Sequence, residues 1–213
     1  MKAVIFDIDS TLIDISSERR FIFYLILRKP LFSIRLLFYL LIFSIRNINR
    51  FNLYMFKEFF IYLKGYNENT YEKLAKQCFD KVIKKHFYPK ALELIDDFKK
   101  KGYTIFLITG SLSFIAINIK NYIEADFLLA TELIVEDGKF TGEVKQFPFD
   151  IDKAITLKGL AKKYKIDLKQ SYAYGDHYTD RHILSLVGHP VATNPDLRLK
   201  QYAKKNGWQI TYF

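Results

Sequence analysis

The sequence predicts an α/β protein: a doubly wound, Rossmann-like parallel sheet with an inserted all-helical cap and a small β-hairpin. Two observations favour this fold class. From residue 89 onward, segments with helical periodicity alternate with short strand-like segments, as in sheets whose parallel strands are joined by helical crossovers. Residues 16–87 show helical periodicity and no strand signal, so we expect them to form a helical insertion after the first strand.

The first strand is the apolar run at residues 3–6, which leads directly into Asp7 and Asp9. Consecutive apolar residues of this kind are typical of a buried strand. In an extended chain, residues two apart point the same way, so the two carboxylates crowd onto one side unless a cation or a proton relieves their repulsion. The pair therefore predicts a metal site, a proton-transfer site, or both.

The insertion is expected to hold four helices. They cover residues 16–28, a stretch that begins near residue 31 behind Pro30, residues 52–64 as far as Gly65, and residues 69–86. The second helix carries apolar residues at helical spacing, which predict a buried face made of Ile34, Phe38, Leu41, Ile42 and Ile45. Its Arg35 and Arg46 are about three turns apart and project from one side, with Arg50 nearby if the helix continues.

After the insertion, the chain alternates between helix and strand. We expect helices at residues 89–101, 112–122, 152–164, 180–187 and 195–206, strands at 103–108, 127–130, 171–174 and 190–192, and a hairpin at 133–144 that turns at residues 137–138. This pattern predicts a core domain of residues 1–15 and 88–213, and a cap domain of residues 16–87 over the carboxyl end of the first strand.

Composition limits the class of protein. Half of the 213 residues are hydrophobic, which excludes a disordered chain. With 33 basic and 23 acidic side chains, the formal charge of +10 favours an anionic partner: a phosphorylated metabolite, an anionic membrane or a nucleic acid. The single cysteine, Cys78, lies in a helical pattern and is expected to fill the core. One cysteine permits no intramolecular disulfide, which fits a reducing compartment.

The most apolar stretch is residues 21–45. Charged residues interrupt it, and its longest uncharged piece, residues 36–45, is too short to span a bilayer but long enough to lie on one. The first residues do not resemble a signal peptide. We therefore expect a cytoplasmic protein, and keep open a peripheral contact of the cap with the inner face of the membrane.

Three further segments bring polar groups to the carboxyl edge of the predicted sheet. The strand at 105–108 opens into Thr109, Gly110 and Ser111, whose hydroxyls and amides lie at a helix amino end, a place suited to an anion. Capping of that helix is the alternative role for both hydroxyls, and for Ser111 it is the one we expect. Lys153 lies at the start of the helix at 152–164 and can reach toward the same edge. As the lysine that would meet an anion there, it is preferred over Lys158, which lies more than one turn further into the helix.

The strand at 171–174 adds Asp176 and Asp180 to the same edge. In open parallel sheets, ligands bind outside the carboxyl ends of the strands, so we expect these clusters to converge. A group of carboxylates without well-spaced histidines or cysteines suits Mg²⁺, while a hydroxyl, a lysine and a helix amino end suit a phosphate. Together they predict phosphoryl transfer.

The segment Asp7-Ile8-Asp9-Ser10-Thr11, with Thr109, Lys153, Gly175-Asp176 and Asp180, resembles the four motifs of the haloacid dehalogenase (HAD) superfamily. The helical insertion resembles that of its phosphoserine phosphatase-like branch, subfamily IB. The resemblance implies a Mg²⁺-dependent phosphatase of phosphate monoesters. It extends from residue 2 to about residue 208 and is looser in the cap.

The resemblance also implies roles for single residues. Asp7 would be the nucleophile that forms an aspartyl-phosphate, and Asp9 would protonate the leaving alcohol and then deprotonate the attacking water. The carboxylates of Asp7 and Asp176 and the backbone carbonyl of Asp9 would bind Mg²⁺. Thr109 and Gly110 would bind the phosphate together with Lys153.

Other residues would support this machinery. Asp180 would hold Lys153 or a metal-bound water, with Thr11 as a further supporting residue. His177 follows Asp176 directly, so contact with the substrate and a surface position are both open. His177 and Thr179 stand where phosphoserine phosphatases have a small residue and an asparagine, and only Glu18 and Arg50 are candidates for their amino-acid-binding pair. Phosphoserine is therefore disfavoured.

The apolar, arginine-bearing cap would suit a phosphate ester with an acyl tail, or docking on anionic lipid. The resemblance adds a phospholipid-precursor phosphate such as phosphatidylglycerophosphate as a candidate substrate, because some members of this branch with such caps act on these esters. The alternatives are a small soluble metabolite such as phosphoserine, a phosphotransferase that uses an acceptor alcohol, and a basic module that binds membrane or nucleic acid without catalysis. We expect a small-molecule or lipid phosphomonoester as the partner, and no nucleic acid.

Overall fold

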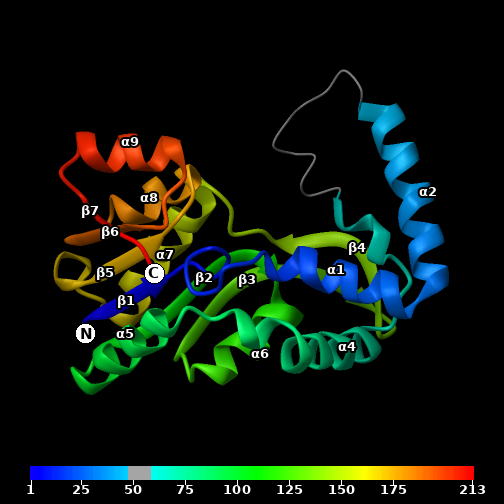
Figure 1. Ribbon diagram of the computed structural model, residues 1–213, viewed down its shortest axis with the longest axis horizontal. Coiled ribbons are helices and arrows are strands. Elements are labelled where there is room, and N and C mark those ends of the chain that lie inside the picture. The colour runs from blue at the N-terminus through cyan, green and yellow to red at the C-terminus, as the bar shows by residue number, and fades with distance from the viewer. Residues whose placement is uncertain (48–58) are drawn as a thin grey trace.

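A computed structural model describes residues 1–47 and 59–213, and the side chains of residues 1–42 and 59–213. The strands form one seven-stranded sheet in the order β4-β3-β2-β1-β5-β6-β7 (Figure 1). All neighbouring strands run parallel except β3 and β4. This is the α/β architecture with a parallel sheet that the sequence predicts.

The strands are β1 Ala3–Phe6, β2 Thr104–Leu112, β3 Phe127–Glu136, β4 Lys139–Gln146, β5 Tyr172–Gly175, β6 His189–Thr193 and β7 Gln209–Thr211. The α-helices are α1 Ser17–Arg28, α2 Pro30–Asn47, α4 Glu68–Lys81, α5 Pro89–Lys100, α6 Ser113–Tyr122, α7 Ile151–Tyr164, α8 Arg181–Leu184 and α9 Leu197–Lys205. Short 3₁₀ helices are η1 Phe59–Leu63, η2 Ile83–His86, η3 Leu168–Gln170 and η4 Tyr178–Asp180.

The sheet separates two apolar clusters, and β1 contributes to both. Val4 and Phe6 belong to the cluster formed with α5, α6 and the inserted helices, while Ala3 and Ile5 belong to the cluster formed with α7, α8 and α9. All four residues are fully buried. Because side chains alternate between the faces of a strand, a strand covered on both faces has to be apolar at every position. The carboxyl end of β1 is therefore fixed at the centre of the sheet.

The regular elements described between β1 and α5 are all helices, as expected. Ser16 caps α1, where its side chain accepts a hydrogen bond from the backbone N–H of Arg19 at 3.4 Å. Cys78 is buried in α4 as predicted. The helix expected at residues 69–86 ends at Lys81 and is followed by η2. Of the helix expected at residues 52–64, only η1 lies within the described residues; it is followed by Gly65, which has a φ of +81°.

The prediction for the buried face of α2 is wrong. Ile34, Phe38 and Leu41 are exposed, Ile42 is half-buried, and the side chain of Ile45 lies outside what the structure describes. The residues that pack inward from α2 are Phe32 and Leu36. The spacing correctly identifies an apolar stripe, but no other part of the described chain covers it.

The arginines of this region are only partly described. The Arg35 guanidinium lies 4.8 Å from the ring centre of Tyr66 and donates a hydrogen bond to the carbonyl of Lys64. The side chain of Arg46, and Arg50 altogether, lie outside what the structure describes.

The second half of the chain follows the predicted order with four differences. β2 does not end at residue 108 but runs on to Leu112, so Thr109, Gly110 and Ser111 belong to the strand and not to the amino end of a helix. β3 runs on to Glu136 and itself enters the hairpin, whose turn at Asp137 and Gly138 has positive φ at both residues. The helix expected at residues 180–187 is a turn of η4 followed by the short α8. β7 was not predicted because three residues carry too little pattern; it pairs with β6 at the sheet edge.

Candidate active site

Segments far apart in sequence form one pocket of about 560 Å³ at the carboxyl ends of β1, β2 and β5. The lining residues that the sequence predicted are Asp7, Asp9, Thr109, Gly110, Lys153, Asp176, His177 and Asp180. Thr11, also predicted, does not line the pocket; it is buried, and its hydroxyl donates to Asp176 Oδ1 at 3.3 Å. The predicted clusters therefore converge.

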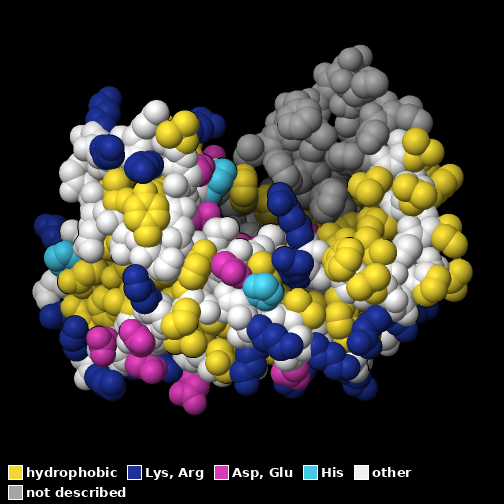
Figure 2. All heavy atoms as spheres, viewed as in Figure 1, with side chains coloured by type: hydrophobic (Ala, Val, Ile, Leu, Met, Phe, Trp, Pro, Cys, Tyr) yellow, Lys and Arg dark blue, Asp and Glu magenta, His cyan; other side chains and the backbone are white. Residues whose placement is uncertain are grey.

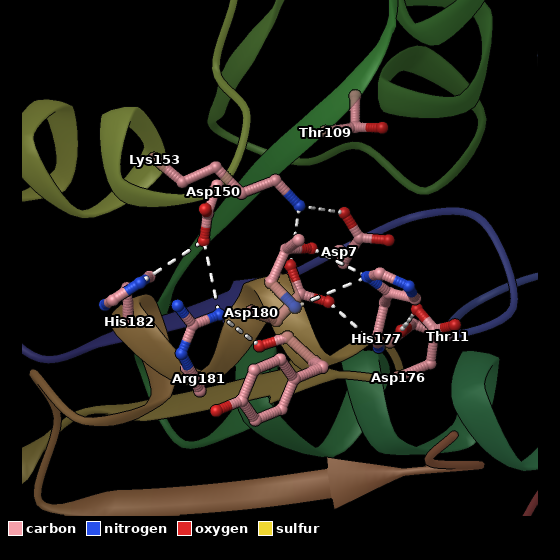
Figure 3. A network of polar contacts seen from close by, with 12 residues as sticks. Asp7, Thr11, Thr109, Asp150, Lys153, Asp176, His177, Asp180, Arg181 and His182 are labelled. Carbon is pink, nitrogen blue, oxygen red and sulfur yellow. Dashed lines mark hydrogen bonds and ion pairs between the residues drawn. The ribbon is translucent and has the colours of Figure 1, made fainter. Parts of the chain in front are cut away.

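Lys153 is the central cation of the site. Its Nζ donates to Asp7 Oδ1 and to Asp180 Oδ1, each at 2.7 Å, from a position near the start of α7 (Figure 3). The side chain is buried, whereas Lys158 on the same helix is exposed. Burial by itself lowers the pKa of Lys153, but the carboxylates of Asp180 and Asp7 outweigh it and raise the pKa above its ordinary value. The lysine therefore stays charged.

Asp7 and Asp176 carry negative charge that one lysine does not neutralise. Burial raises the pKa of Asp7 to about 7; Lys153 opposes this shift, and Asp180 and Asp9 add to it. Burial, with Asp7 and Asp180 as neighbours, raises the pKa of Asp176 to about 8. The backbone N–H of Asp7 donates to the Tyr174 carbonyl at 3.0 Å, which ties the end of β1 to β5.

This charge imbalance fits a metal ion. One carboxylate oxygen from each of Asp7, Asp176 and Asp180 lies within 4.8 Å of the others. Three carboxylates beside one ammonium leave a net negative charge, and oxygen ligands suit a hard divalent cation. The expected ligand set was Asp7, Asp9 and Asp176. The Asp9 carboxylate is not part of this cluster, which leaves its backbone carbonyl as the atom to consider.

The Asp9 carboxylate is held by the amino end of α1 and by β2. Ser17 N donates to its Oδ1 at 3.0 Å, and the Ser111 hydroxyl donates to its Oδ2 at 2.9 Å. The hydroxyls of Ser17 and Ser111 also lie 3.0 Å apart. Burial raises the pKa of Asp9, and the hydrogen bonds from Ser17 and Ser111 partly oppose this shift.

The expected role of Ser111 as a simple helix cap is therefore wrong. The residue at the cap position of α6 is Leu112, and Ser111 instead contacts Asp9. The signal was present in the sequence, because Thr109 and Ser111 lie two apart at the end of a strand and point the same way. Thr109 itself is buried, and its hydroxyl accepts a hydrogen bond from Ser111 N at 3.1 Å.

The loop after β5 is shaped around Asp180. A Cβ on Gly175 would lie 2.8 Å from the Cβ of Asp180, so this contact requires glycine. The backbone N–H of His177 donates to Asp180 Oδ2 at 3.2 Å, and its ring Nδ1 accepts from Thr179 N at 3.3 Å. Asp180 caps its own loop in this way while it binds Lys153. The His177 side chain is largely exposed at the pocket.

The wall of the pocket was not predicted. It is formed by Ile22 of α1, Phe60 of η1, and Phe147 and Phe149 of the segment that joins β4 to α7. The Phe147 and Phe149 rings are stacked with centres 5.4 Å apart. Phe147 and Phe149 lie outside the helices and strands that the sequence predicts, and Phe60 lies in the helix expected at residues 52–64 without a sign that it faces the pocket.

Two residues of α1 add charge to the same wall. Glu18 and Arg19 both line the pocket. Burial, with the Asp9 charge as a smaller cause, raises the pKa of Glu18 to about 8. Arg50, proposed as the partner of Glu18, lies outside the described residues.

This fold and this site are those of a HAD-type hydrolase. The profile of the family described as haloacid dehalogenase-like hydrolase matches residues 4–185, and the chain belongs to this family. Among curated relatives, the "inhibition of morphological differentiation protein" of Streptomyces azureus is 32% identical over 151 residues, 70% of this chain and 54% of that protein. Phosphoserine phosphatase SerB1 of Mycobacterium tuberculosis is 31% identical over 153 residues, 71% of this chain and 50% of that protein.

The chain thus spans about half the length of the curated relatives it matches. A solved structure of a protein of unknown function from Bordetella pertussis matches with a TM-score of 0.84 and 22% identity, and covers 99% of this chain and 97% of that chain. At this identity the match shows the fold alone. Together these findings support the phosphoserine phosphatase-like branch that the insertion resembles.

Proposed function

We propose that this protein is a Mg²⁺-dependent phosphatase that hydrolyses a phosphate monoester through an aspartyl-phosphate on Asp7. The observation that carries this proposal is the buried bridge from Asp7 through Lys153 to Asp180, in a pocket that also holds Asp9, Thr109 and Asp176. Buried charge clusters of this kind are costly and are concentrated at functional sites.

In the first step, an Asp7 carboxylate oxygen bonds to phosphorus and the ester bond to the alcohol breaks. Lys153 fixes the orientation of that carboxylate and offsets the charge of the phosphate. Asp9 gives its proton to the leaving alcohol oxygen. The burial that raises the pKa of Asp9 favours the protonated form that this step needs.

In the second step, Asp9 takes a proton from water, the water oxygen bonds to phosphorus, and the bond from Asp7 to phosphorus breaks. Inorganic phosphate leaves and both aspartates return to their starting state. Ser17 N and the Ser111 hydroxyl hold the Asp9 carboxylate for both proton transfers. Thr109 and the backbone of Gly110, at the end of β2, bind the phosphate oxygens.

Mg²⁺ would be held by the carboxylates of Asp7 and Asp176 and the backbone carbonyl of Asp9. When bound, it neutralises charge on the phosphate and on the carboxylates. Asp180 acts through Lys153 and through the loop it caps, and is therefore a positioning residue. Support for the ion comes from the uncompensated charge of Asp7 and Asp176.

The alcohol half of the substrate meets an apolar wall. Ile22, Phe60, Phe147 and Phe149 line the same pocket as the carboxylates, which favours an ester whose alcohol carries an apolar group. A phospholipid-precursor phosphate such as phosphatidylglycerophosphate has this chemistry. We propose that the inserted helices act as a cap that keeps bulk water from the reaction, because α1 and η1 supply part of this wall.

The test is a phosphatase screen across lipid, sugar, nucleotide and amino-acid phosphates, with and without Mg²⁺. We expect turnover that depends on Mg²⁺, prefers esters with apolar alcohols and disappears in Asp7→Asn. A preference for phosphoserine or another small soluble ester would overturn the substrate class, and absence of turnover on every ester would overturn the enzyme.

Two alternatives are separated by the products and by the variant. A phosphotransferase would pass the phosphoryl group to an added acceptor alcohol in preference to water, so release of inorganic phosphate is measured with and without such acceptors. A basic binding module would bind nucleic acid in a salt-sensitive way, equally well in wild type and in Asp7→Asn, and would show no turnover.

A further inference from the structure

An apolar surface covers the outer side of α2. We name it the α2 apolar face: Leu31, Ile34, Leu37, Phe38 and Leu41. These residues recur at the spacing of one helical stripe, and their exposed fractions run from 58% for Leu41 to 81% for Leu31. Figure 2 shows apolar side chains gathered over α2 at the right of the view.

The face extends onto α1, where Phe23 and Leu27 are exposed at 55% and 69%. Soluble monomers seldom leave a contiguous patch of large apolar side chains open to water, and such patches mark contact surfaces. The periodicity of the sequence indicates a buried stripe, and the described protein leaves that same stripe uncovered. Within the described residues, the stripe is therefore open to contact with a further surface.

Basic side chains lie beside the face. Arg20, Arg28 and Lys29 are exposed on α1 and at the turn into α2. The Arg28 guanidinium lies 4.4 Å from the ring centre of Tyr24, which keeps it near the helix surface. Among the described side chains of residues 19–42 there are five Lys or Arg and no Asp or Glu. The surroundings of the face are thus cationic.

We infer that the α2 apolar face docks on an anionic lipid bilayer. An apolar stripe beside cationic residues is the pattern of a helix that lies in the membrane interface. Within the described ranges, no helix is long and apolar enough to cross a membrane. The charge of the surroundings attracts the anionic headgroups, and the apolar stripe enters the acyl boundary.

The same features disfavour protein occupants. A symmetric contact between two copies through this face would bring two sets of basic side chains together, with no acidic residue among the described side chains of residues 19–42 to pair with them. Protein interfaces also carry hydrogen bonds at regular density. The five side chains of the α2 apolar face contain no polar atom.

Docking in this way would place α1, which supplies part of the pocket wall, at the bilayer surface. Arg19 and Ile22 of α1 line the pocket, and Phe23, the residue after Ile22, is exposed and belongs to the extension of the face. An ester with an acyl tail would then reach the pocket from the membrane side. The docking inference itself stands on α1 and α2 and does not rest on the proposed activity.

The experiment is co-sedimentation of the full chain with vesicles of phosphatidylcholine mixed with phosphatidylglycerol, and with vesicles of pure phosphatidylcholine. Two triple variants test the face: Leu31→Ser with Leu37→Ser and Phe38→Ser, and Arg20→Gln with Arg28→Gln and Lys29→Gln. The matched control, Ile151→Ser with Ile155→Ser and Leu197→Ser, removes apolar residues of α7 and α9 that are exposed at 55–71%. Thermal melts followed by circular dichroism check that each variant folds.

We expect binding to the anionic vesicles, weakened by added salt, and a loss of affinity of more than about tenfold in each face variant. The control triple and Asp7→Asn should bind like wild type, so this result is independent of turnover. The single variant Leu31→Ser, at the most exposed position, gives the same direction should a triple variant fail to fold.

Three results would overturn the inference. The first is a wild-type protein that sediments with neither kind of vesicle. The second is binding that the apolar triple leaves unchanged, which would mean that general charge attraction is responsible. The third is a concentration-dependent dimer without vesicle binding that the apolar triple dissociates, which would make the face a contact between copies of this chain.

Discussion

Replacing Lys153 by Met leaves Asp7, Asp176 and Asp180 as a buried cluster of carboxylates without a cation. The lysine is 4% exposed and makes two 2.7 Å contacts, so the methionine fits the space and loses only the charge and its hydrogen bonds. Breaking a buried ion pair by removing one partner costs about 3–5 kcal/mol of unfolding free energy. Loss of one charge-stabilising donor lowers kcat by about 10²–10³.

The sign of the pH dependence follows from Asp7. Its pKa is already raised to about 7 with Lys153 present, and without the lysine it rises further. When the pKa of a carboxyl is higher in the folded than in the unfolded protein, the protein loses stability as pH rises from the unfolded pKa to the folded pKa, because the unfolded state releases the proton first. We therefore expect Lys153→Met to cost more unfolding free energy at about pH 8 than at about pH 5 in metal-free buffer.

The assay is urea unfolding at both pH values beside steady-state turnover at neutral pH. Lys158→Met on the same helix is the matched control, since Lys158 is exposed, and it should change the unfolding free energy by less than about 0.5 kcal/mol. An equal loss of stability at both pH values, or a Lys158→Met variant as impaired as Lys153→Met, would refute this account of the site.

Three further predictions concern neighbouring residues. Gly175→Ala forces a Cβ to 2.8 Å from that of Asp180, so calorimetry should show a loss of about 1–3 kcal/mol of unfolding free energy, and assays should show a lower kcat. The control Gly159→Ala in α7 has open space around the new methyl group and should stabilise the protein by about 0.5–1 kcal/mol. Glu18→Gln removes a carboxyl with a pKa of about 8. The unfolding free energy of this variant relative to wild type should therefore rise between about pH 4.5 and pH 8, by at most roughly 1.4 kcal/mol per pH unit. A difference in unfolding free energy that does not change with pH would contradict the raised pKa of Glu18. Mg²⁺ should raise the Tm of wild type and leave that of Asp176→Asn unchanged; an equal rise in both would exclude Asp176 as a ligand.

Much of the candidate site follows from strand order. A buried strand followed by Asp7 and Asp9, and a later strand followed by Thr109, have to end at the same edge when the sheet is parallel, so sequence alone brings these residues together. Lys153 could be chosen over Lys158 by its place at the start of α7. These inferences depend only on local pattern and on the direction of neighbouring strands.

The remaining features depend on tertiary placement. The contact of Ser111 with Asp9 is completed by Ser17, which belongs to the inserted helices, and nothing in the sequence states how those helices dock. Phe147 and Phe149 line the pocket from a segment outside the described helices and strands. For α2, periodicity identifies an apolar stripe but does not show whether the protein covers it. The sequence therefore predicted a buried Phe38, whereas this side chain is exposed.

The central claim is that Asp7 carries the phosphoryl group. We would measure it with Asp9→Asn, which lacks the base for the second step, and an activated aryl phosphate, whose leaving group needs no acid. With Mg²⁺ present, rapid mixing should give a burst of one phenolate per protein molecule, and borohydride reduction should convert Asp7 to homoserine in the amino-terminal peptide. Absence of both the burst and the modified Asp7, or a phosphoryl group on another residue such as His177, would contradict the mechanism.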